Sequence, residues 1–265
     1  MITKTQAKQT TISIETSLKG VGLHTGKDVE IKFLPAIANS GYVFVRKDLE
    51  GAPMIKADAN LVTSTQRGTC LEKNGVSIQT CEHVLAALVG LEIDNITIEL
   101  NNAEPPIMDG SSKFFVEALE SVGIKTLDVF RDVFVVKDVI SYVDEETGSD
   151  ITIIPSDEYQ VTTMVDFGTK VLGTQNATLS KLSNFKSQIS NSRTFSFLHE
   201  LETLLEEGLI KGGDLNNAIV YVDKPLSKET MGKLKKAFNK DSISVQPNGI
   251  LDNLTLHYPN EAARH

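Results

Sequence analysis

The sequence contains no tryptophan, and aromatic residues make up only 6% of its 265 positions. Proteins that bind single-stranded nucleic acid rely on stacking against aromatic side chains, so this composition argues against such a surface. Cysteine is scarce as well, with Cys70 and Cys81 alone. Two cysteines cannot build a disulfide-stapled fold and suit a reducing compartment, although one bridge between them stays formally open.

Long apolar runs and an excess of positive charge are also missing. No stretch approaches the ~18 apolar residues of a transmembrane helix, and the first ten residues are polar, unlike a signal peptide. Asp and Glu number 35 against 26 Lys and Arg, a formal net charge of −9. We therefore predict a cytoplasmic protein with no transmembrane segment and no nucleic-acid partner, in which an anionic substrate would need a local basic pocket.

The sequence does have the composition of a globular protein, with 40% hydrophobic residues and enough length for one large or two medium domains. Its first half mixes alternating patterns, typical of strands, with longer helical patterns. Strands are predicted in segments 11–17, 29–34, 41–46 and 94–100, and helices in 84–91 and 111–124.

The second half of the sequence repeats a similar order of strand and helix patterns. The segment TGKDVEIKFLP (25–35) is similar to TGSDITIIP (147–155), and each is followed by a further strand pattern. These matches favour two similar α+β units joined near residues 127–131. Two unrelated hairpins with the same turn chemistry are the alternative, because one matched segment is weak evidence of duplication.

Residues 193–222 are predicted to form a β-α-β insertion in the second half, with a helix at 198–207. Glycines 208, 212 and 213 end that helix. Apolar positions are more numerous than a small isolated unit needs: Phe197, Leu198, Leu201, Leu205, Ile210, Leu215, Ala218 and Val220. On the residues alone, packing against the main core is favoured over a passage for a long alkyl chain.

Glu82 and His83 form a polar pair at the start of an otherwise apolar helix, directly after Thr80 and Cys81. The helix dipole disfavours an imidazolium there and stabilises a carboxylate. A neutral imidazole beside an ionised carboxylate suits a metal ligand beside a general base. The alternative, favoured for an isolated pair, is that Glu82 caps the helix and His83 is a buried structural histidine.

Three further features acquire meaning only in combination. His265 follows NEAAR, which resembles the first turn of a helix, and by itself is read as a terminal residue of no consequence. Asp109 lies in the turn PPIMDGSS, where capping explains it adequately. Thr194 and Phe195, in SRTF, offer one hydroxyl beside one aromatic ring.

Taken together, GVGLHTGKDV, TCEHVLAALVGLEIDNITIEL, PPIMDGSS, SRTF and the final ARH resemble one family. The chain is similar to UDP-3-O-acyl-N-acetylglucosamine deacetylase, a zinc enzyme of lipid A biosynthesis, from about residue 16 to residue 265. The resemblance implies an α+β fold of two similar β/α units, residues 1–127 and 128–265, that form a β-α-α-β sandwich around a zinc site. It also implies that the insertion at about 193–222 forms the passage for the acyl chain.

Site roles follow from the resemblance, residue by residue. Glu82 matches the general base, and Thr194 the partner of the oxyanion. His83 and His265 match two ligands of Zn²⁺. Substrate-binding positions are matched by Phe195, Asp166, Phe167 and Glu261, and acyl-passage positions by Phe197, Leu198, Leu201, Ile210, Gly213, Leu215, Ala218 and Val220.

The chain also departs from the family pattern. The family's third ligand is an Asp four residues beyond the second His, on the same helical face, and its general-acid His lies farther on. A basic residue expected just after the second ligand is missing too, and an apolar residue near Ile154 replaces a Lys found in some relatives. These departures predict a C-terminally truncated, inactive chain; in some relatives the chain continues into a fused dehydratase domain.

The resemblance therefore implies zinc-dependent removal of the N-acetyl group from an acylated UDP-sugar, with release of acetate. The sequence is also compatible with two other classes of function. The chain could be a non-catalytic module that binds an acylated sugar nucleotide, which the missing ligand favours. It could also be an acyl-binding interaction domain in which Glu82 and His83 are purely structural, and which binds no zinc.

Overall fold

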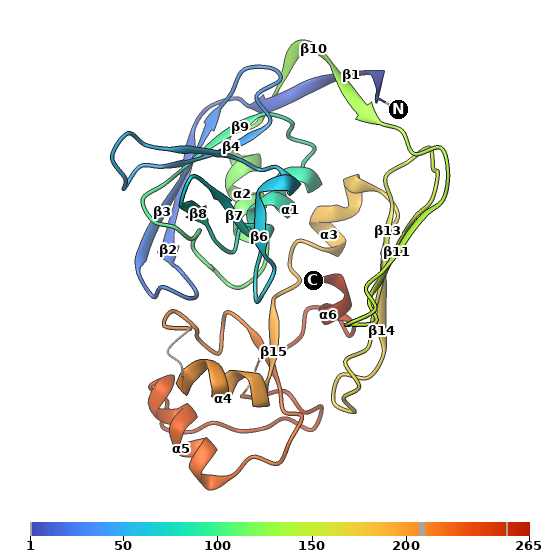
Figure 1. Ribbon diagram of the computed structural model, residues 1–265. Helices are drawn as coiled ribbons and strands as arrows, with labels where there is room; N and C mark the ends of the chain where they lie inside the picture. The colour runs from blue at the N-terminus through green and yellow to red at the C-terminus, as the bar shows by residue number, and fades with distance from the viewer. Residues whose placement is uncertain (1, 207–209, 253) are drawn as a thin grey trace.

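The computed structural model describes residues 2–206, 210–252 and 254–265. A sheet with two helices, an exposed pair of hairpins and a smaller helical unit make up the molecule (Figure 1). Gly208, a predicted helix breaker, lies outside the described residues. Within the described ranges, no helix has the length and apolar character needed to cross a membrane.

The first half is built on a five-stranded sheet with the order β2-β3-β9-β4-β5. Only β4 and β9 pair in parallel, and the other neighbours are antiparallel. The strands are β2 (Thr16–Val21), β3 (Asp28–Pro35), β4 (Tyr42–Arg46), β5 (Met54–Lys56) and β9 (Ile96–Leu100). A separate antiparallel sheet contains β6 (Val62–Ser64), β7 (Cys70–Lys73) and β8 (Val76–Ile78), and a short 3-10 helix spans Ala59–Leu61.

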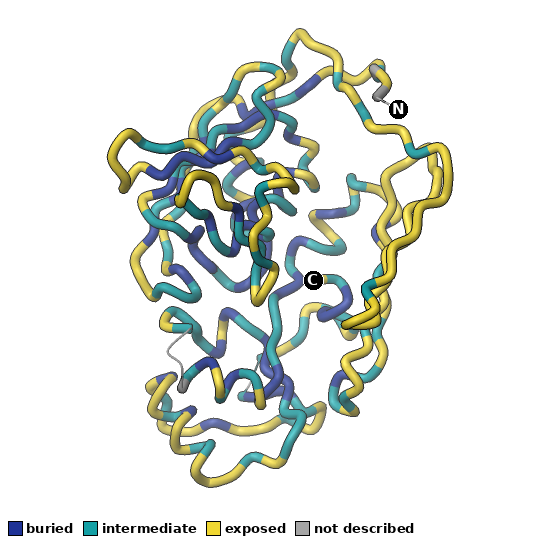
Figure 2. Tube along the Cα trace, in the orientation of Figure 1, coloured by how far each residue is buried: buried dark blue, intermediate teal, exposed yellow. Residues whose placement is uncertain are grey.

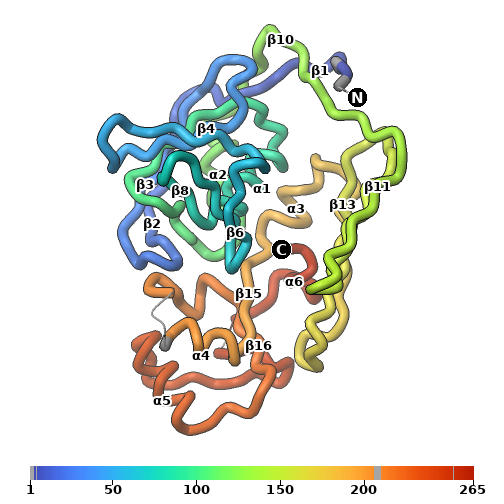
Figure 3. The backbone as a smooth tube through the Cα atoms, in the orientation of Figure 1, coloured from blue at the N-terminus to red at the C-terminus, as the bar shows by residue number. Residues whose placement is uncertain are grey.

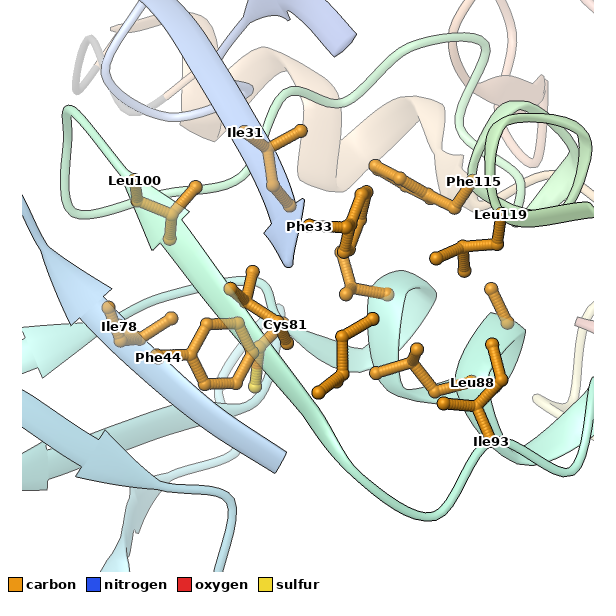
Figure 4. Close-up of a cluster of buried hydrophobic side chains, with 14 of the residues drawn as sticks. Ile31, Phe33, Phe44, Ile78, Cys81, Leu88, Ile93, Leu100, Phe115 and Leu119 are labelled. Atoms are coloured by element: carbon orange, nitrogen blue, oxygen red, sulfur yellow. The ribbon is translucent and has the colours of Figure 1, made fainter. Parts of the chain in front are cut away.

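Helices α1 (Glu82–Gly90) and α2 (Lys113–Ser121) pack with the sheet around one apolar core (Figure 4). Burial alternates along β3 and β9, as expected of strands with one face toward a core. Phe33 of β3 and Phe115 of α2 meet edge to face, with ring centres 6.4 Å apart. This core anchors the N-terminal end of α1, which carries Glu82 and His83.

A long antiparallel ribbon of β1 (Ile2–Ile12) and β10 (Ile124–Phe134) connects the halves. The boundary predicted near residues 127–131 therefore lies inside a strand. The predicted strand at 11–17 is wrong, because β1 ends at Ile12 and β2 begins at Thr16, after a bend.

The second half contains two separate hairpins, not one sheet. They are formed by β11 (Ile140–Val143) with β12 (Asp150–Ile153), and by β13 (Val161–Val165) with β14 (Gln175–Leu179). Figure 2 shows the β11–β12 hairpin as an exposed strip along one side of the molecule. Helices and strands are thus mixed as predicted, whereas the sandwich of two similar units stays a prediction.

The second half also contains a smaller unit, at the bottom of Figure 3. Strands β15 (Phe195–Phe197) and β16 (Ile219–Tyr221) pair in parallel, with α4 (Leu198–Glu206) between them in the chain. Helix α5 (Lys228–Ala237) shares an apolar cluster with α4. Three short helical segments complete the chain, at Leu182–Asn184, α3 (Phe185–Gln188) and α6 (Glu261–Arg264).

Candidate metal and catalytic site

The turn before α1 is strained and held by a buried carboxylate. Thr80 has a φ of 51°, in the left-handed region, and its hydroxyl donates to Glu104 at 3.1 Å. Glu104 is fully buried and also accepts from the backbone N–H groups of His24 and Thr25. The residue at the helix cap is Cys81, and its side chain makes no capping hydrogen bond. A single carboxylate therefore fastens the His24 loop to the start of α1.

The Glu82 carboxylate does not cap the helix. One oxygen, Oε2, accepts a hydrogen bond of 2.9 Å from the backbone N–H of Thr69. The side chain borders a cavity together with Arg67 and Gly68. Glu82 is therefore oriented by the backbone of the loop just before β7, with its side chain at the cavity, where a carboxylate is able to accept a proton.

His83 and His265 are 182 residues apart in sequence and meet ring to ring. Their centres are 5.1 Å apart, with the planes inclined at 77°. Burial lowers the pKa of both imidazoles to about 4, and for His265 the neighbouring His83 lowers it further. Asp109 and, at His265, Glu82 and Glu261 oppose this shift. Both rings are consequently neutral at pH 7.

The His265 ring has a defined tautomer. Its Nδ1 lies 3.3 Å from the carbonyl oxygen of Ser192, and a carbonyl can only accept. Nδ1 therefore carries the hydrogen in the neutral ring, which leaves the lone pair on Nε2. A backbone carbonyl behind the ring is the usual way a metal-binding histidine is oriented.

The two rings fit a shared zinc ion. Two imidazoles on one tetrahedral zinc, at Zn–N distances of about 2.0–2.1 Å, have ring centres on the order of 5 Å apart. The observed separation of 5.1 Å agrees with this geometry. Among the residues described here, no group of three or more His, Cys, Asp or Glu side chains could hold a metal ion. The structure therefore brings together two candidate ligands of the kind that zinc prefers.

Thr194 is fixed on both sides by backbone hydrogen bonds. Its N–H donates to Gly110 at 2.7 Å, and its carbonyl accepts from Ile219 at 2.9 Å. Gly110 has a φ of 82°, and a Cβ there would lie 2.0 Å from the carbonyl oxygen of Asn217. Glycine is thus required where the loop after Met108 meets the backbone of Asn217, next to Thr194.

A cavity of about 550 Å³ opens beside these groups. Many of the predicted site residues border it, from both halves of the chain. They are Glu82, Phe167, Thr194, Phe195, Phe197, Leu201, Ile210, Gly213, Leu215, Ala218, Val220 and His265. The insertion contributes most of the apolar lining, together with polar residues such as His199, Asp214 and Asn217.

Four predicted residues do not border the cavity. His83 lies behind His265, in contact with its ring. Leu198 is completely buried among the apolar side chains of the insertion, so it supports the wall without lining it. Asp166 binds the N–H of Gly168 and the hydroxyl of Thr174. These bonds shape the loop that carries Phe167, and they account for the conformation of Asp166 without a substrate.

Glu261 differs most from its expected role. It is completely buried, and its carboxylate pairs with Arg193 at 2.8 Å. The same carboxylate accepts from the N–H of His257 at 2.7 Å. A carboxylate committed to internal donors is not directed at the cavity, so its position does not support a substrate contact.

The structure adds lining residues that the sequence did not assign. His24 stands out in sequence only by its glycine neighbours, and His199 by its place in the predicted insertion helix. No pattern in the sequence predicts that Phe238, which follows α5, reaches the cavity, because its position depends on the packing of α5 against α4. The other additions are Leu23, Arg67, Gly68, Thr169, Ser196, Glu200, Leu204, Asp214 and Asn217.

Comparison with known proteins matches the chain to one family. The family model described as LpxC, UDP-3-O-acyl N-acetylglycosamine deacetylase, matches residues 9–232. The matched region holds Glu82, His83 and Thr194 and ends before α6.

Relatives of two kinds are similar to the chain. It is 43% identical over 258 residues to the bifunctional enzyme LpxC/FabZ of Bacteroides thetaiotaomicron, covering 97% of this chain and 56% of the relative. The bifunctional enzyme LpxC/FabZ of Porphyromonas gingivalis gives the same figures. The UDP-3-O-acyl-N-acetylglucosamine deacetylase of Thermosynechococcus vestitus is 37% identical over 223 residues, covering 82% of this chain and 77% of the relative. The chain spans about half the length of the bifunctional relatives it matches.

Proposed function

We propose, from the premise that the chain belongs to the UDP-3-O-acyl N-acetylglycosamine deacetylase family, that it hydrolyses the N-acetyl group of a UDP-3-O-acyl-N-acetylglucosamine in a zinc-dependent reaction. The observation that carries the proposal is the meeting of the His83 and His265 rings at 5.1 Å. Acetate and a free sugar amine are the products, in a committed step of lipid A biosynthesis.

His83 and His265 are the residues that would hold the metal. Both are neutral at pH 7 because burial lowers their pKa values, so neither must lose a proton to bind. When bound, zinc supplies a Lewis acid that polarises the acetamide carbonyl and lowers the pKa of a water molecule. The resemblance assigns a third ligand to a position four residues beyond His265, outside the chain described here.

Glu82 serves as the general base. Its Oε2 is held by the Thr69 N–H, and the carboxylate faces the cavity next to the two imidazoles. It removes the proton from the attacking water as the new C–O bond forms. A positioned general base contributes typically about 10²–10⁴-fold to the rate.

Thr194 stabilises the negative charge that develops on the acetamide oxygen. Its backbone bonds to Gly110 and Ile219 fix the main chain of the residue before substrate arrives, which holds the hydroxyl close to where the charge develops. The leaving amine takes its proton from a general acid that the resemblance places beyond residue 265.

The cavity walls suit an acylated sugar nucleotide. The insertion contributes a largely apolar wall that includes Leu201, Leu215 and Val220, which favours an alkyl chain. Phe167 and Phe195 lie edge to face with ring centres 5.6 Å apart, and both rings border the cavity. These residues are proposed to contact the sugar and nucleotide.

The protein is proposed to act in the cytoplasm, where a sugar-nucleotide substrate would be met. A fused dehydratase domain is proposed as well. The bifunctional names of two relatives support it, together with the 56% of their length that this chain covers.

A second candidate function is binding of the acylated sugar nucleotide without hydrolysis. The observation in its favour is that the described residues supply two candidate metal ligands, not three. This alternative predicts substrate binding by residues 1–265 and no release of acetate even by the full product of the gene.

Zinc content and acetate release by the full gene product test the proposal. We expect about one zinc per chain and a loss of about 10²–10⁴-fold in kcat for Glu82→Gln, with zinc content retained. Glu72→Gln, which changes an exposed carboxylate on β7 outside the cavity, is the control and should keep near-normal kcat. Zinc-independent hydrolysis, or full activity of Glu82→Gln, would refute the assignment.

A further inference from the structure

The short helix α6 cannot hold its own position. It contains four residues, Glu261–Arg264, and helices of this length have little stability by themselves. His265 follows directly and is tied to the helix by one bond from its N–H to the Glu261 carbonyl. Contacts with the rest of the molecule must therefore decide where the His265 ring lies.

The strongest of these contacts is a buried pair between Arg193 and Glu261. The Arg193 side chain is 9% exposed and the Glu261 side chain 0%. Glu261 Oε1 accepts from the Arg193 backbone N–H at 3.0 Å and from its Nε at 2.8 Å, and Oε2 accepts from Nη2 at 3.2 Å. Arg193 Nη2 also donates to the carbonyl of Thr255 at 2.7 Å.

Three consecutive residues thereby connect the two sides of the site. The Ser192 carbonyl lies behind the His265 ring, Arg193 binds the side chain at the start of α6, and Thr194 borders the cavity. Any rotation of α6 about its axis would break bonds at Glu261 and His265 together. Other bonds also hold α6, such as those from Thr163 to the Ala263 carbonyl and from Arg264 to the Gln188 carbonyl. The 192–194 segment differs in that it contacts α6, the His265 ring and the cavity together, so it links the position of His265 to that of Thr194.

A contribution to overall stability does not by itself explain the pair. Burying two charges carries a large desolvation cost, and apolar replacements of buried ion pairs are often neutral or stabilising. The five hydrogen bonds of the pair, in contrast, define both position and orientation. The charge pair is therefore better explained by a role in fixing the position of the His265 side chain.

We propose that Arg193 and Glu261 are a positioning pair that holds His265 opposite His83 and next to Thr194. The inference rests on the proposed function for one point, that His265 binds zinc. The position of the His265 ring is a property of the metal-free protein and does not depend on that function. Neither residue borders the cavity, so neither is expected to touch the substrate.

The test compares ring contact and zinc affinity in matched variants of residues 1–265. Contact between the His83 and His265 rings is measured by proton nuclear Overhauser effects without metal, and affinity by zinc competition with a chelating dye. We expect Glu261→Ala and Arg193→Ala to lose the ring contact and to bind zinc about 10–100-fold more weakly. Should Glu261→Ala fail to fold, Glu261→Gln carries the test, with a smaller but measurable loss expected in both readouts.

Asp48→Ala is the matched control. It breaks another arginine–carboxylate pair with two bonds, in which a buried Arg46 binds both oxygens of the more exposed Asp48 at 2.7–2.9 Å, in the first half of the chain. This control should keep the ring contact and wild-type zinc affinity. Unchanged ring contact in both Glu261 variants would overturn the inference, as would an equal loss in Asp48→Ala.

Failure of the positioning pair can be distinguished from failure of the proposed zinc-dependent function. Loss of ring contact in Glu261→Ala, when even the wild type binds no zinc, would support the positioning pair and count against the zinc enzyme. Normal zinc binding by the wild type, with intact contact and affinity in the Glu261 variants, would leave the proposed function standing and refute the positioning pair.

Discussion

The two sides of the site are held in different ways. Glu82 and His83 begin a helix whose apolar face is part of a closed core, in which Phe33, Phe44 and Phe115 are fully buried. The second half leaves large apolar side chains exposed on its hairpins, including Tyr142 at 66% and Ile151 at 63%.

The difference concerns how each side chain is positioned. His83 is fixed by core packing, which resists displacement because interiors are densely packed. His265 depends on a handful of polar bonds around a one-turn helix. A site of this kind joins a rigid surface to one whose position can be altered by single polar substitutions.

Truncation of the first core should have the largest effect on stability. Phe44→Ala removes a fully buried ring on β4 and should lower the free energy of unfolding by about 3–5 kcal/mol. Ile151→Ala, on the exposed hairpin, should change it by less than ~0.5 kcal/mol. Urea unfolding measures both. Equal losses of unfolding free energy in the two variants would show that the hairpin is as well packed as the first half.

Acid should destabilise the metal-free protein through the two imidazoles. Burial lowers both pKa values to about 4, whereas the rings of the unfolded chain titrate near the ordinary histidine pKa of 6.5. Between these values the unfolded state binds protons that the folded state does not. The stabilisation is complete above pH 6.5 and is lost as the pH falls toward 4, by about 1.4 kcal/mol per pH unit for each ring.

Urea unfolding in chelator, at pH values from 7.5 to 4.5, measures this slope. The groups that face the rings are Asp109, Glu82 and Glu261, so carboxylate titration must be separated from that of the rings. A variant with both His83→Gln and His265→Gln provides that baseline. Identical slopes for this variant and the wild type between pH 5 and 6.5 would contradict the burial of neutral rings.

A change in the apolar wall should have the smallest effect and should be confined to substrate choice. A Cβ at Gly213 would lie 3.1 Å from the Ile210 carbonyl and 3.4 Å from its side chain. Gly213→Leu should therefore narrow the passage and raise KM for long acyl chains about 10-fold, a loss within the range of one pocket contact. Turnover of short-chain analogues should be nearly unchanged, and equal losses for both would contradict the passage assignment.

Local patterns predicted the elements with regular periodicity. The apolar run after Glu82 is α1, and the alternation before Leu100 is β9. The strand β1 was missed because its sequence, ITKTQAKQTTI, is polar and its formation depends on pairing with β10. Helix α5 was also missed, since KETMGKLKKA has few apolar residues and packs mainly through Leu234.

The site could be assembled from sequence only through resemblance to a family. No spacing rule relates Glu82, Thr194 and His265, because they come from separate elements that meet only in the folded chain. Sequence also could not show which way Glu261 faces: a polar residue one turn before a ligand can point toward substrate or toward a buried partner. The arginine that decides the matter lies 68 residues earlier in the chain.

Zinc titration of single histidine variants tests the central claim most directly. If one ion is held jointly from both halves, His83→Ala and His265→Ala should each weaken zinc binding by at least about 100-fold, since two-ligand sites lose most of their affinity with either ligand. His257→Ala, which alters a histidine whose backbone rather than ring contacts Glu261, should bind as the wild type does. Wild-type affinity in either of the first two variants would contradict the account.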